Sequence, residues 1–213
     1  MGKITRPLLP DGVGKTYVEI GGIKWATMNI GASNETDYGL YFQWGDTAGY
    51  TASQVGSNTT NYKKPFNWAD CVLHKGSSST VTLMTKYNAN DGLTELEPVN
   101  DAAVANWGGK WRMPTFTECQ ELARLTTQTW TDDYKGSGVS GNIRTSKTDS
   151  TKTLFFPSTG RATNGGITDE GSTNTQFWSS SLYVNSVSYG RSMSGYSARC
   201  NGYPIRPVYD ESL

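Results

Sequence analysis

The stretch NDAAVANWGGKWRMPTFTECQELARL, Asn100 to Leu125, predicts two short helices separated by a glycine turn. Asn100 or Asp101 can cap the first helix, DAAVANW, because a short polar side chain accepts hydrogen bonds from the free backbone N–H groups of a first turn. The glycine pair of WGGKW ends this helix, since glycine readily adopts the left-handed conformation found at helix C-termini.

The second helix carries the clearest local signal of the chain. Thr115 is followed three residues later by Glu118, the spacing of a capping box in which each side chain satisfies a backbone N–H near the other. An apolar stripe for burial follows, formed by Cys119, Leu122, Ala123 and Leu125. Cys119 is therefore predicted to be a small buried hydrophobe rather than a reactive thiol.

Short strands and loops are predicted around these helices. TYVEIGGIKWATMNIG, Thr16 to Gly31, alternates apolar and polar residues around a glycine pair, as a β-hairpin does. YGLYFQWGD is expected to enter the core, TLFFPSTGR to form a strand, and the Ser/Thr/Asn/Gly-rich segment Thr47 to Ser79 to form long surface loops. Two short helices among many short strands predict an α+β fold.

The composition limits the classes of partner. The 213 residues have a formal net charge of zero, with acids and bases interspersed, so no basic field is expected to hold nucleic acid or an anionic membrane. No apolar run reaches the ~20 residues of a membrane span. The start, MGKITRPLLPDG, lacks the apolar segment of a signal peptide. Either a leader was removed, or the protein never used one, as for a phage structural component.

The three cysteines and the single histidine suggest little chemistry. They are too scattered for a disulfide scaffold or a zinc site, and Cys71 with Cys200 is the pair considered for a bridge. His74 lies in the polar stretch LHKGSSS without a second ligand at metal spacing, and is predicted to be a solvated surface residue.

Two glycine motifs are interpreted as turns. GSGVSG, Gly136 to Gly141, matches a phosphate-binding pattern that requires a strand before it and a helix N-terminus after it, whereas its flanks here, TDDYK and NIRTSK, are both turn or strand material. NANDG, Asn88 to Gly92, resembles part of a calcium loop without its final Glu. No cofactor is expected. Calcium bound by oxygen ligands stays open for the acids Asp46, Asp91, Glu95, Glu97 and Asp101.

The motifs EPVNDAAVANWGGKWRMPTFTECQEL, LFFPSTGR, FWSSS and RCNGYPIRPV together resemble the FISUMP-type paralogous domain found in surface proteins of anaerobic gut bacteria. They also resemble the C-type-lectin-fold variable proteins of diversity-generating retroelements, which include phage receptor-binding tips. YVEIGGIKWATMNIG and GLYFQWGD fit as well, so the resemblance covers nearly the whole chain from about Thr16.

The resemblance implies a C-type-lectin-like α+β fold with two short helices, small antiparallel sheets, long loops and adjacent termini. One domain would span residues 16–213 after a lead-in or linker over residues 1–15. Matched residues would be structural: Arg112 and Arg206 would pair or hydrogen-bond inside the core, and Pro114 and Pro207 would set turns. The implied core aromatics are Trp107, Trp111, Phe177 and Trp178. Cys119 replaces the aromatic residue usual in the family, which leaves the local packing open.

The segment Ser181 to Tyr203, SLYVNSVSYGRSMSGYSARCNGY, corresponds to the variable region of the retroelement-diversified relatives. In these relatives, adenines of a template, chiefly in Asn codons, are replaced at random, and the resulting codons cannot encode Lys, Glu, Gln, Met or Trp. Ser179 to Tyr209 contains only Met193 from this set. Tyr offers a large contact area with few rotatable bonds, while Ser, Gly and Asn give adaptable hydrogen bonds, as in evolved paratopes.

The segment is therefore predicted to be a binding surface held by a frame that includes Cys200, Asn201 and Gly202. If VSYGRSM is a strand, Val187, Tyr189, Arg191 and Met193 share one face, and the alternate residues share the other. The candidate contact residues are Tyr183, Asn185, Ser186, Ser188, Tyr189, Arg191, Ser192, Ser194, Tyr196, Ser197 and Tyr203.

The leading hypothesis is a ligand-binding domain, not an enzyme, whose variable surface recognises a cell-surface protein or glycan. It would act outside the cell, on a phage tip or as a bacterial surface adhesin, and a homo-oligomer is compatible with this role. One alternative is a non-variable FISUMP-type surface domain with a structural or carbohydrate-binding role. Another is an oxidase on the related formylglycine-generating-enzyme fold, whose paired-cysteine copper site has no matching motif here.

Overall fold

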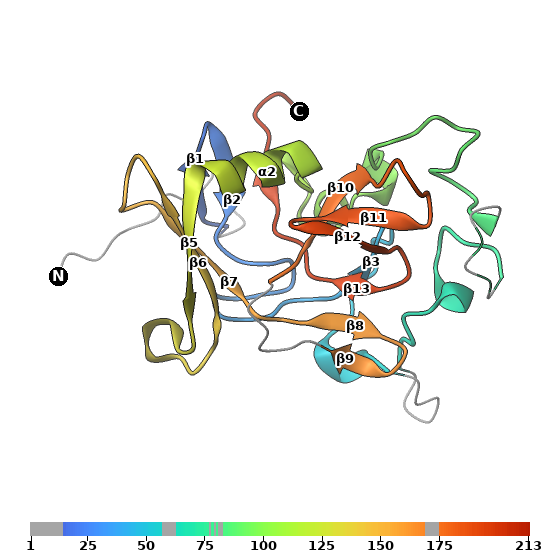
Figure 1. Cartoon of the computed structure of the whole chain (residues 1–213), viewed down its shortest axis with the longest axis horizontal. Helices are drawn as coiled ribbons and strands as arrows, with labels where there is room; N and C mark the ends of the chain where they lie inside the picture. The colour runs from blue at the N-terminus through green and yellow to red at the C-terminus, as the bar shows by residue number, and fades with distance from the viewer. Residues whose placement is uncertain (1–14, 57–62, 77, 79, 81–82, 169–174) are drawn as a thin grey trace.

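The computed structural model describes residues 15–56, 63–76, 78, 80, 83–168 and 175–213. Over these residues it has a mixed α+β fold of two short α-helices and small, mostly antiparallel sheets (Figure 1). None of the helices found there is long and apolar enough to cross a membrane. Apart from Lys15, the expected lead-in over residues 1–15 lies outside the described residues.

Both predicted helices are confirmed. α1 (Ala102–Trp107) begins after Asp101, whose carboxylate accepts from two backbone N–H groups of its first turn, and Gly108 ends it with a φ of 65°. α2 (Phe116–Leu125) begins after Thr115, and the expected capping box is present. Its buried stripe is narrower than predicted because Ala123 is exposed.

The first sheet joins the start of the described chain to its end. Gly21 and Gly22, with φ values of 63° and 79°, turn the predicted hairpin. The C-terminal strand then pairs with the second strand of that hairpin. The strand order is β1 (Tyr17–Ile20), β2 (Ile23–Ala26), β14 (Val208–Tyr209) and β4 (Trp111–Arg112).

Three further sheets complete the described fold, all with antiparallel pairs. The GSGVSG motif follows β5 (Thr126–Thr131) and leads into β6 (Gly141–Ser146), whose first residue is its last glycine, which confirms that it is a turn between strands. One sheet has the order β3 (Phe42–Gln43), β13 (Gly202–Tyr203), β8 (Arg161–Thr163), β9 (Gly166–Thr168). The others are β5 (Thr126–Thr131), β6 (Gly141–Ser146), β7 (Thr153–Pro157), and β10 (Trp178–Leu182), β11 (Tyr189–Ser192), β12 (Gly195–Ala198). Short 3-10 helices are η1 (Ala52–Gln54), η3 (Trp68–Asp70), η5 (Pro98–Asn100) and η6 (Tyr134–Gly136).

The predicted loop region from residue 47 to 79 has buried anchors among its described residues. The prediction of a solvated His74 is wrong: the side chain is 8% exposed, and its ring packs 4.8 Å from that of Trp68. Its Nδ1 forms a hydrogen bond with the Gly76 carbonyl at 2.6 Å. The considered bridge between Cys71 and Cys200 is not formed, because both thiols are free and buried. Cys119 is fully buried, as predicted.

The expected core aromatics are buried, with the exception of Trp107. Trp111, Phe177 and Trp178 are shielded from solvent. Trp107 is half-buried because it ends α1 at the edge of the core, where its ring packs edge-on against Trp111 at 5.0 Å. Arg112 also lies at an edge, paired with acids rather than enclosed in the core.

Arg206 is fully buried and hydrogen-bonds inside the core, as expected. Its Nε donates to the Asn29 side-chain oxygen at 2.9 Å, and its Nη atoms donate to the carbonyls of Ala26 at 3.2 Å and Phe155 at 3.0 Å. Its guanidinium lies 4.4 Å from the ring centroid of Phe156. One side chain therefore connects β2, β7 and the C-terminal segment.

Replacing Arg206 with Met should lower the free energy of unfolding by about 3 kcal/mol or more, because three buried acceptors lose a charged donor. Urea unfolding measures the change. The control Arg124→Met removes an exposed guanidinium from α2 and should change stability by less than about 0.5 kcal/mol. Equal effects of the two substitutions would contradict a central role for Arg206.

Candidate binding surface

A floor of buried indoles supports the C-terminal hairpin β11–β12. The indole N–H of Trp44 donates to the Ser179 carbonyl at 2.9 Å, and that of Trp178 donates to the Phe42 carbonyl at 2.8 Å. Gly190 lies against Trp44, where a Cβ atom would come within 2.5 Å of the indole ring. β11 can approach the core this closely because position 190 has no side chain.

Arg199, which directly follows β12, anchors the end of the hairpin to the core. It is fully buried, and its Nη atoms donate to the carbonyls of Lys86, Tyr87 and Val187 at 3.0 to 3.1 Å. Burial lowers the pKa of Arg199 to about 10, so the group stays cationic at neutral pH. The guanidinium also lies 4.6 Å from the Trp44 ring centroid. Sequence reasoning missed this anchor, since an Arg in a Ser/Tyr-rich segment gives no sign of burial.

Strand alternation sorts the predicted contact residues. Tyr189 and Arg191 are half-buried on the outward face of β11, whereas the alternate residues Gly190 and Ser192 are buried. The expectation that Met193 shares a strand face with Tyr189 and Arg191 is not met, because β11 ends at Ser192. The Met193 side chain is 5% exposed and packs into a core cluster.

Three tyrosines form a packed cluster on the outward side. The rings of Tyr183 and Tyr196 stack with centroids 4.1 Å apart and an interplanar angle of 7°. Tyr189 packs edge-on against Tyr196 at 5.5 Å and against Tyr183 at 6.5 Å. Tyr196 is 53% exposed. Among the other predicted contact residues, Ser186 is half-buried, and Asn185 and Ser194 are exposed.

Four predicted contact residues are buried and are corrected here: Ser188, Ser192, Ser197 and Tyr203. Ser192 donates to the Gln176 side-chain oxygen at 3.2 Å. Tyr203 donates to Ser197 Oγ at 3.2 Å and packs edge-on against Trp178 at 4.8 Å. They therefore lie in the frame together with Cys200, Asn201 and Gly202, which are buried or half-buried.

Phe116, at the first position of α2, joins the surface from outside the C-terminal segment. The Arg191 guanidinium lies 4.2 Å from the ring centroid of Phe116 and 4.6 Å from that of Tyr183. We call Phe116, Tyr183, Tyr189, Arg191 and Tyr196 the tyrosine surface. Sequence reasoning missed Phe116; its signal was an aromatic residue at a helix start, off the buried stripe.

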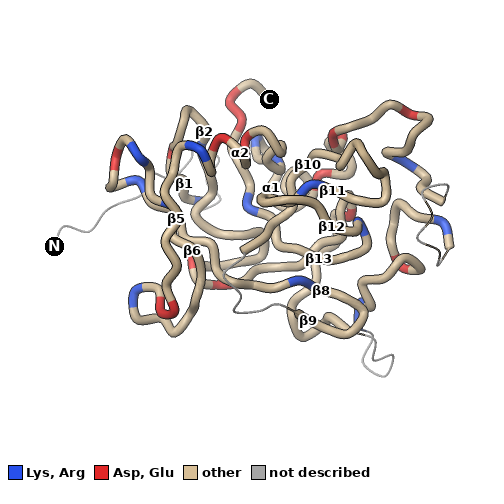
Figure 2. Tube along the Cα trace, viewed as in Figure 1, with Lys and Arg blue, Asp and Glu red and all other residues tan. Residues whose placement is uncertain are grey.

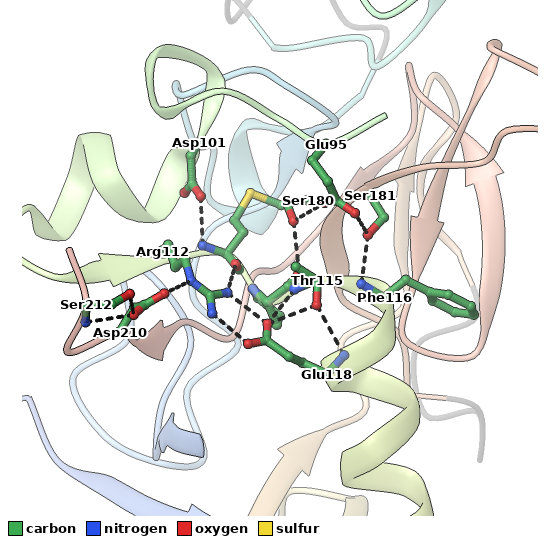
Figure 3. A network of polar contacts seen from close by, with 12 residues as sticks. Glu95, Asp101, Arg112, Thr115, Phe116, Glu118, Ser180, Ser181, Asp210 and Ser212 are labelled. Carbon is green, nitrogen blue, oxygen red and sulfur yellow. Dashed lines mark hydrogen bonds and ion pairs between the residues drawn. The ribbon is translucent and has the colours of Figure 1, made fainter. Parts of the chain in front are cut away.

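Figure 3 shows the hydrogen bonds that hold Phe116 in place. Its backbone N–H donates to Ser181 Oγ at 2.8 Å, and that hydroxyl donates to the Glu95 carboxylate at 2.5 Å. The Ser180 hydroxyl donates to the other Glu95 oxygen at 2.6 Å. The first turn of α2 is thereby tied to β10.

The same network reaches the C-terminal end of the chain. Arg112 donates to Glu118 at 2.6 and 2.8 Å and to Asp210 at 2.8 Å (Figure 3). Hydrogen bonds from Ser212 and Arg112 lower the pKa of Asp210 to about 2. Burial alone would raise the pKa of Glu118, but hydrogen bonds from Arg112 and Thr115 lower it. These groups line an open cleft of about 490 Å³ in which Arg112 is already paired.

The five acids considered for calcium are engaged separately. Asp101 caps α1, Glu95 accepts from two serines, and Glu97 pairs with Lys86. Asp91 accepts from backbone N–H groups of its own turn, and Asp46 lies 3.7 Å from Lys64 Nζ. Within the described ranges, no group of three or more His, Cys, Asp or Glu residues could hold a metal ion.

Acidic and basic residues are interspersed along the described trace, and the strands β10 to β12 carry few of them (Figure 2). Comparisons of the chain with models of protein families, with curated proteins and with solved structures found no match.

Replacing Gly190 with Ala should lower the free energy of unfolding by about 1–3 kcal/mol, because the added methyl group overlaps the Trp44 ring. Urea unfolding again provides the measurement. Gly195→Ala in the same hairpin is the matched control, since a Cβ there meets nothing within 4 Å. Equal stability of the two variants would show that the buried indole of Trp44 does not constrain β11.

Replacing Asp210 with Asn should weaken the acid dependence of stability. The folded-state pKa of about 2 lies below the ~3.9 of an unfolded Asp, so the favourable contribution is complete above pH ~4 and is lost as the pH falls toward 2. The variant should lose less stability than the wild type in that window, as followed by thermal melts. Asp132→Asn, at an exposed acid outside the network, should leave the window unchanged. Parallel behaviour of both variants would argue against the Arg112–Asp210 pair.

Proposed function

We propose that the chain is a ligand-binding domain with a C-type-lectin-like fold, whose tyrosine surface recognises a cell-surface protein or glycan. The observation that carries the proposal is the cluster of Tyr183, Tyr189 and Tyr196, packed ring against ring on the outward side of a hairpin. Tyrosines held in place lose little conformational entropy on binding, which favours affinity.

The position of Met193 supports diversification of the surface. Met193 is the one residue of Ser179 to Tyr209 that codons randomised at adenines and ending in a pyrimidine cannot encode. It is buried in the core, where a varied residue would disturb the packing. The outward residues Asn185, Ser194 and Tyr196 are all of types that such codons encode.

The proposed domain acts outside the cell, on a phage tip or as a bacterial surface adhesin, binds no nucleic acid and performs no catalysis. Its thiols give little support to a copper-dependent oxidase. Burial raises the pKa of the Cys119 and Cys200 thiols, and among the described residues neither belongs to a group of three or more side chains that could hold a metal ion.

One observation favours the alternative of a non-variable surface domain with a structural or carbohydrate-binding role. Tyr183 and Tyr196 stack on each other, so each ring presents one face fewer to a ligand. The encoding locus separates the alternatives. A nearby template copy that differs only at adenines, together with a reverse transcriptase gene, is expected for the diversified domain; their absence would rule diversification out.

Replacing Tyr183, Tyr189 and Tyr196 together with Ala should reduce binding of the labelled protein to intact gut bacteria at least about 100-fold, since buried interface tyrosines each contribute about 2 kcal/mol. Flow cytometry over a panel of isolates measures binding. The melting temperature should fall only by a few degrees, because these rings lie outside the core clusters.

The control is Tyr17→Ala, which removes a half-buried tyrosine from the first sheet and should leave binding unchanged. Unchanged binding of the triple variant would place the ligand elsewhere on the chain. A collapse of its melting temperature would show that the three tyrosines are core residues.

A further inference from the structure

The Arg191 guanidinium is held between two aromatic rings at the centre of the tyrosine surface. Its carbon lies 4.2 Å from the Phe116 centroid and 4.6 Å from the Tyr183 centroid. In the hairpin register Arg191 is opposite Tyr196, so a third ring belongs to the same neighbourhood. Stacking occupies the faces of the planar group and leaves its N–H donors at the edge for other contacts.

These edge donors have no acceptor among the described residues. Arg112 and Arg124 pair with carboxylates, and the buried Arg206 and Arg199 donate to oxygens of the chain. Arg191 is oriented by its rings and makes no ion pair within the described ranges. The nearby Glu95 carboxylate is occupied by the hydroxyls of Ser180 and Ser181. A half-buried cation with free donors is therefore ready for an external anion.

We propose that Arg191 binds an Asp or Glu carboxylate of a protein partner, an inference that rests on the proposed binding function. The rings fix the guanidinium before binding, so a planar carboxylate can take two parallel hydrogen bonds at little conformational cost. Phe116 extends the site beyond the C-terminal segment. The Ser181–Glu95 network fixes the backbone of Phe116, so one of the two rings that hold Arg191 is positioned from outside that segment.

An exposed aliphatic side chain next to Tyr183 in the chain, together with the exposed ring of Tyr196, favours a protein over a glycan. Val184, in the connection between β10 and β11, is 63% exposed, and Tyr196 is 53% exposed. An aliphatic side chain offers a sugar little, whereas protein interfaces combine apolar and aromatic contacts with Arg near their centre. The partner surface therefore carries an acid surrounded by apolar side chains.

The test uses a phage-displayed library of random linear peptides selected on the intact protein. Peptides retained by the wild type should be enriched in Asp and Glu over the input library. Arg191→Gln should bind these peptides at least about tenfold more weakly, and amidating the peptide acid should cost the wild type the same factor but cost the variant little. Arg191→Glu should select peptides enriched in Lys and Arg. Arg124→Glu, on the exposed side of α2, is the control and should select as the wild type does.

Several results would overturn the inference. The first is a set of selected peptides without enrichment in Asp and Glu. The second is equal affinity of the wild type and Arg191→Gln for the selected peptides. The third is that the wild type retains no peptide, and binding of carboxylate-bearing glycans on an array would not change that conclusion. Melting temperatures within a few degrees of the wild type exclude misfolding, and Arg191→Lys, which keeps the charge but not the paired donors, should give intermediate affinity.

The outcome for the proposed function is read separately. Peptides that need the tyrosine cluster but tolerate Arg191→Gln leave that function standing and remove this inference. Peptides that need Arg191 but tolerate the triple tyrosine variant remove the function assigned to the tyrosines and leave a carboxylate site.

Discussion

A guanidinium withdrawn from water must be surrounded by acceptors, and this requirement organises the fold around Arg206. Desolvating the cation costs several kcal/mol, which is offset by the hydrogen bonds that Arg206 donates to three separate parts of the chain: the end of β2, the loop at Asn29, and β7. The guanidinium of Arg206 thus joins the first hairpin, the sheet of β5, β6 and β7, and the C-terminal segment. Arg199 repeats the arrangement under the hairpin, where backbone carbonyls alone receive its donors.

The same residue type serves the opposite purpose eight positions earlier in the chain. Arg191 is held by rings instead of acceptors, because strand alternation turns it outward while Gly190 lets β11 settle on Trp44. The surface is thus built from two layers: tyrosines and a cation without an ion pair among the described residues outside, and indoles with a hydrogen-bonded cation inside. The inner layer holds the hairpin, and the proposed recognition chemistry belongs to the outer one.

Local signals in the sequence predicted the elements whose stabilising groups are neighbours in the chain. The capping box of Thr115 and Glu118 and the glycine turn of the first hairpin are of this kind. Contacts between residues far apart in the sequence could not be predicted from local signals. Nothing near His74 indicates that Trp68 covers it, and nothing near Ser192 or Ser197 indicates partners that bury them. Composition indicated a candidate binding segment, but only the register of β11 and β12 separated its outward residues from its frame.

The floor under Gly190 also governs how freely this segment can change. Asn185, Ser194 and Tyr196 are exposed, so changes at these positions should disturb the core little. Gly190 and Arg199 lie against Trp44 and Ser192 is fully buried, so changes at these positions should destabilise the fold. Positions that should tolerate substitution and positions that should not thus lie within a few residues of each other. A population of such chains can explore many surfaces with little loss of folded molecules, provided that variation keeps to the outward positions.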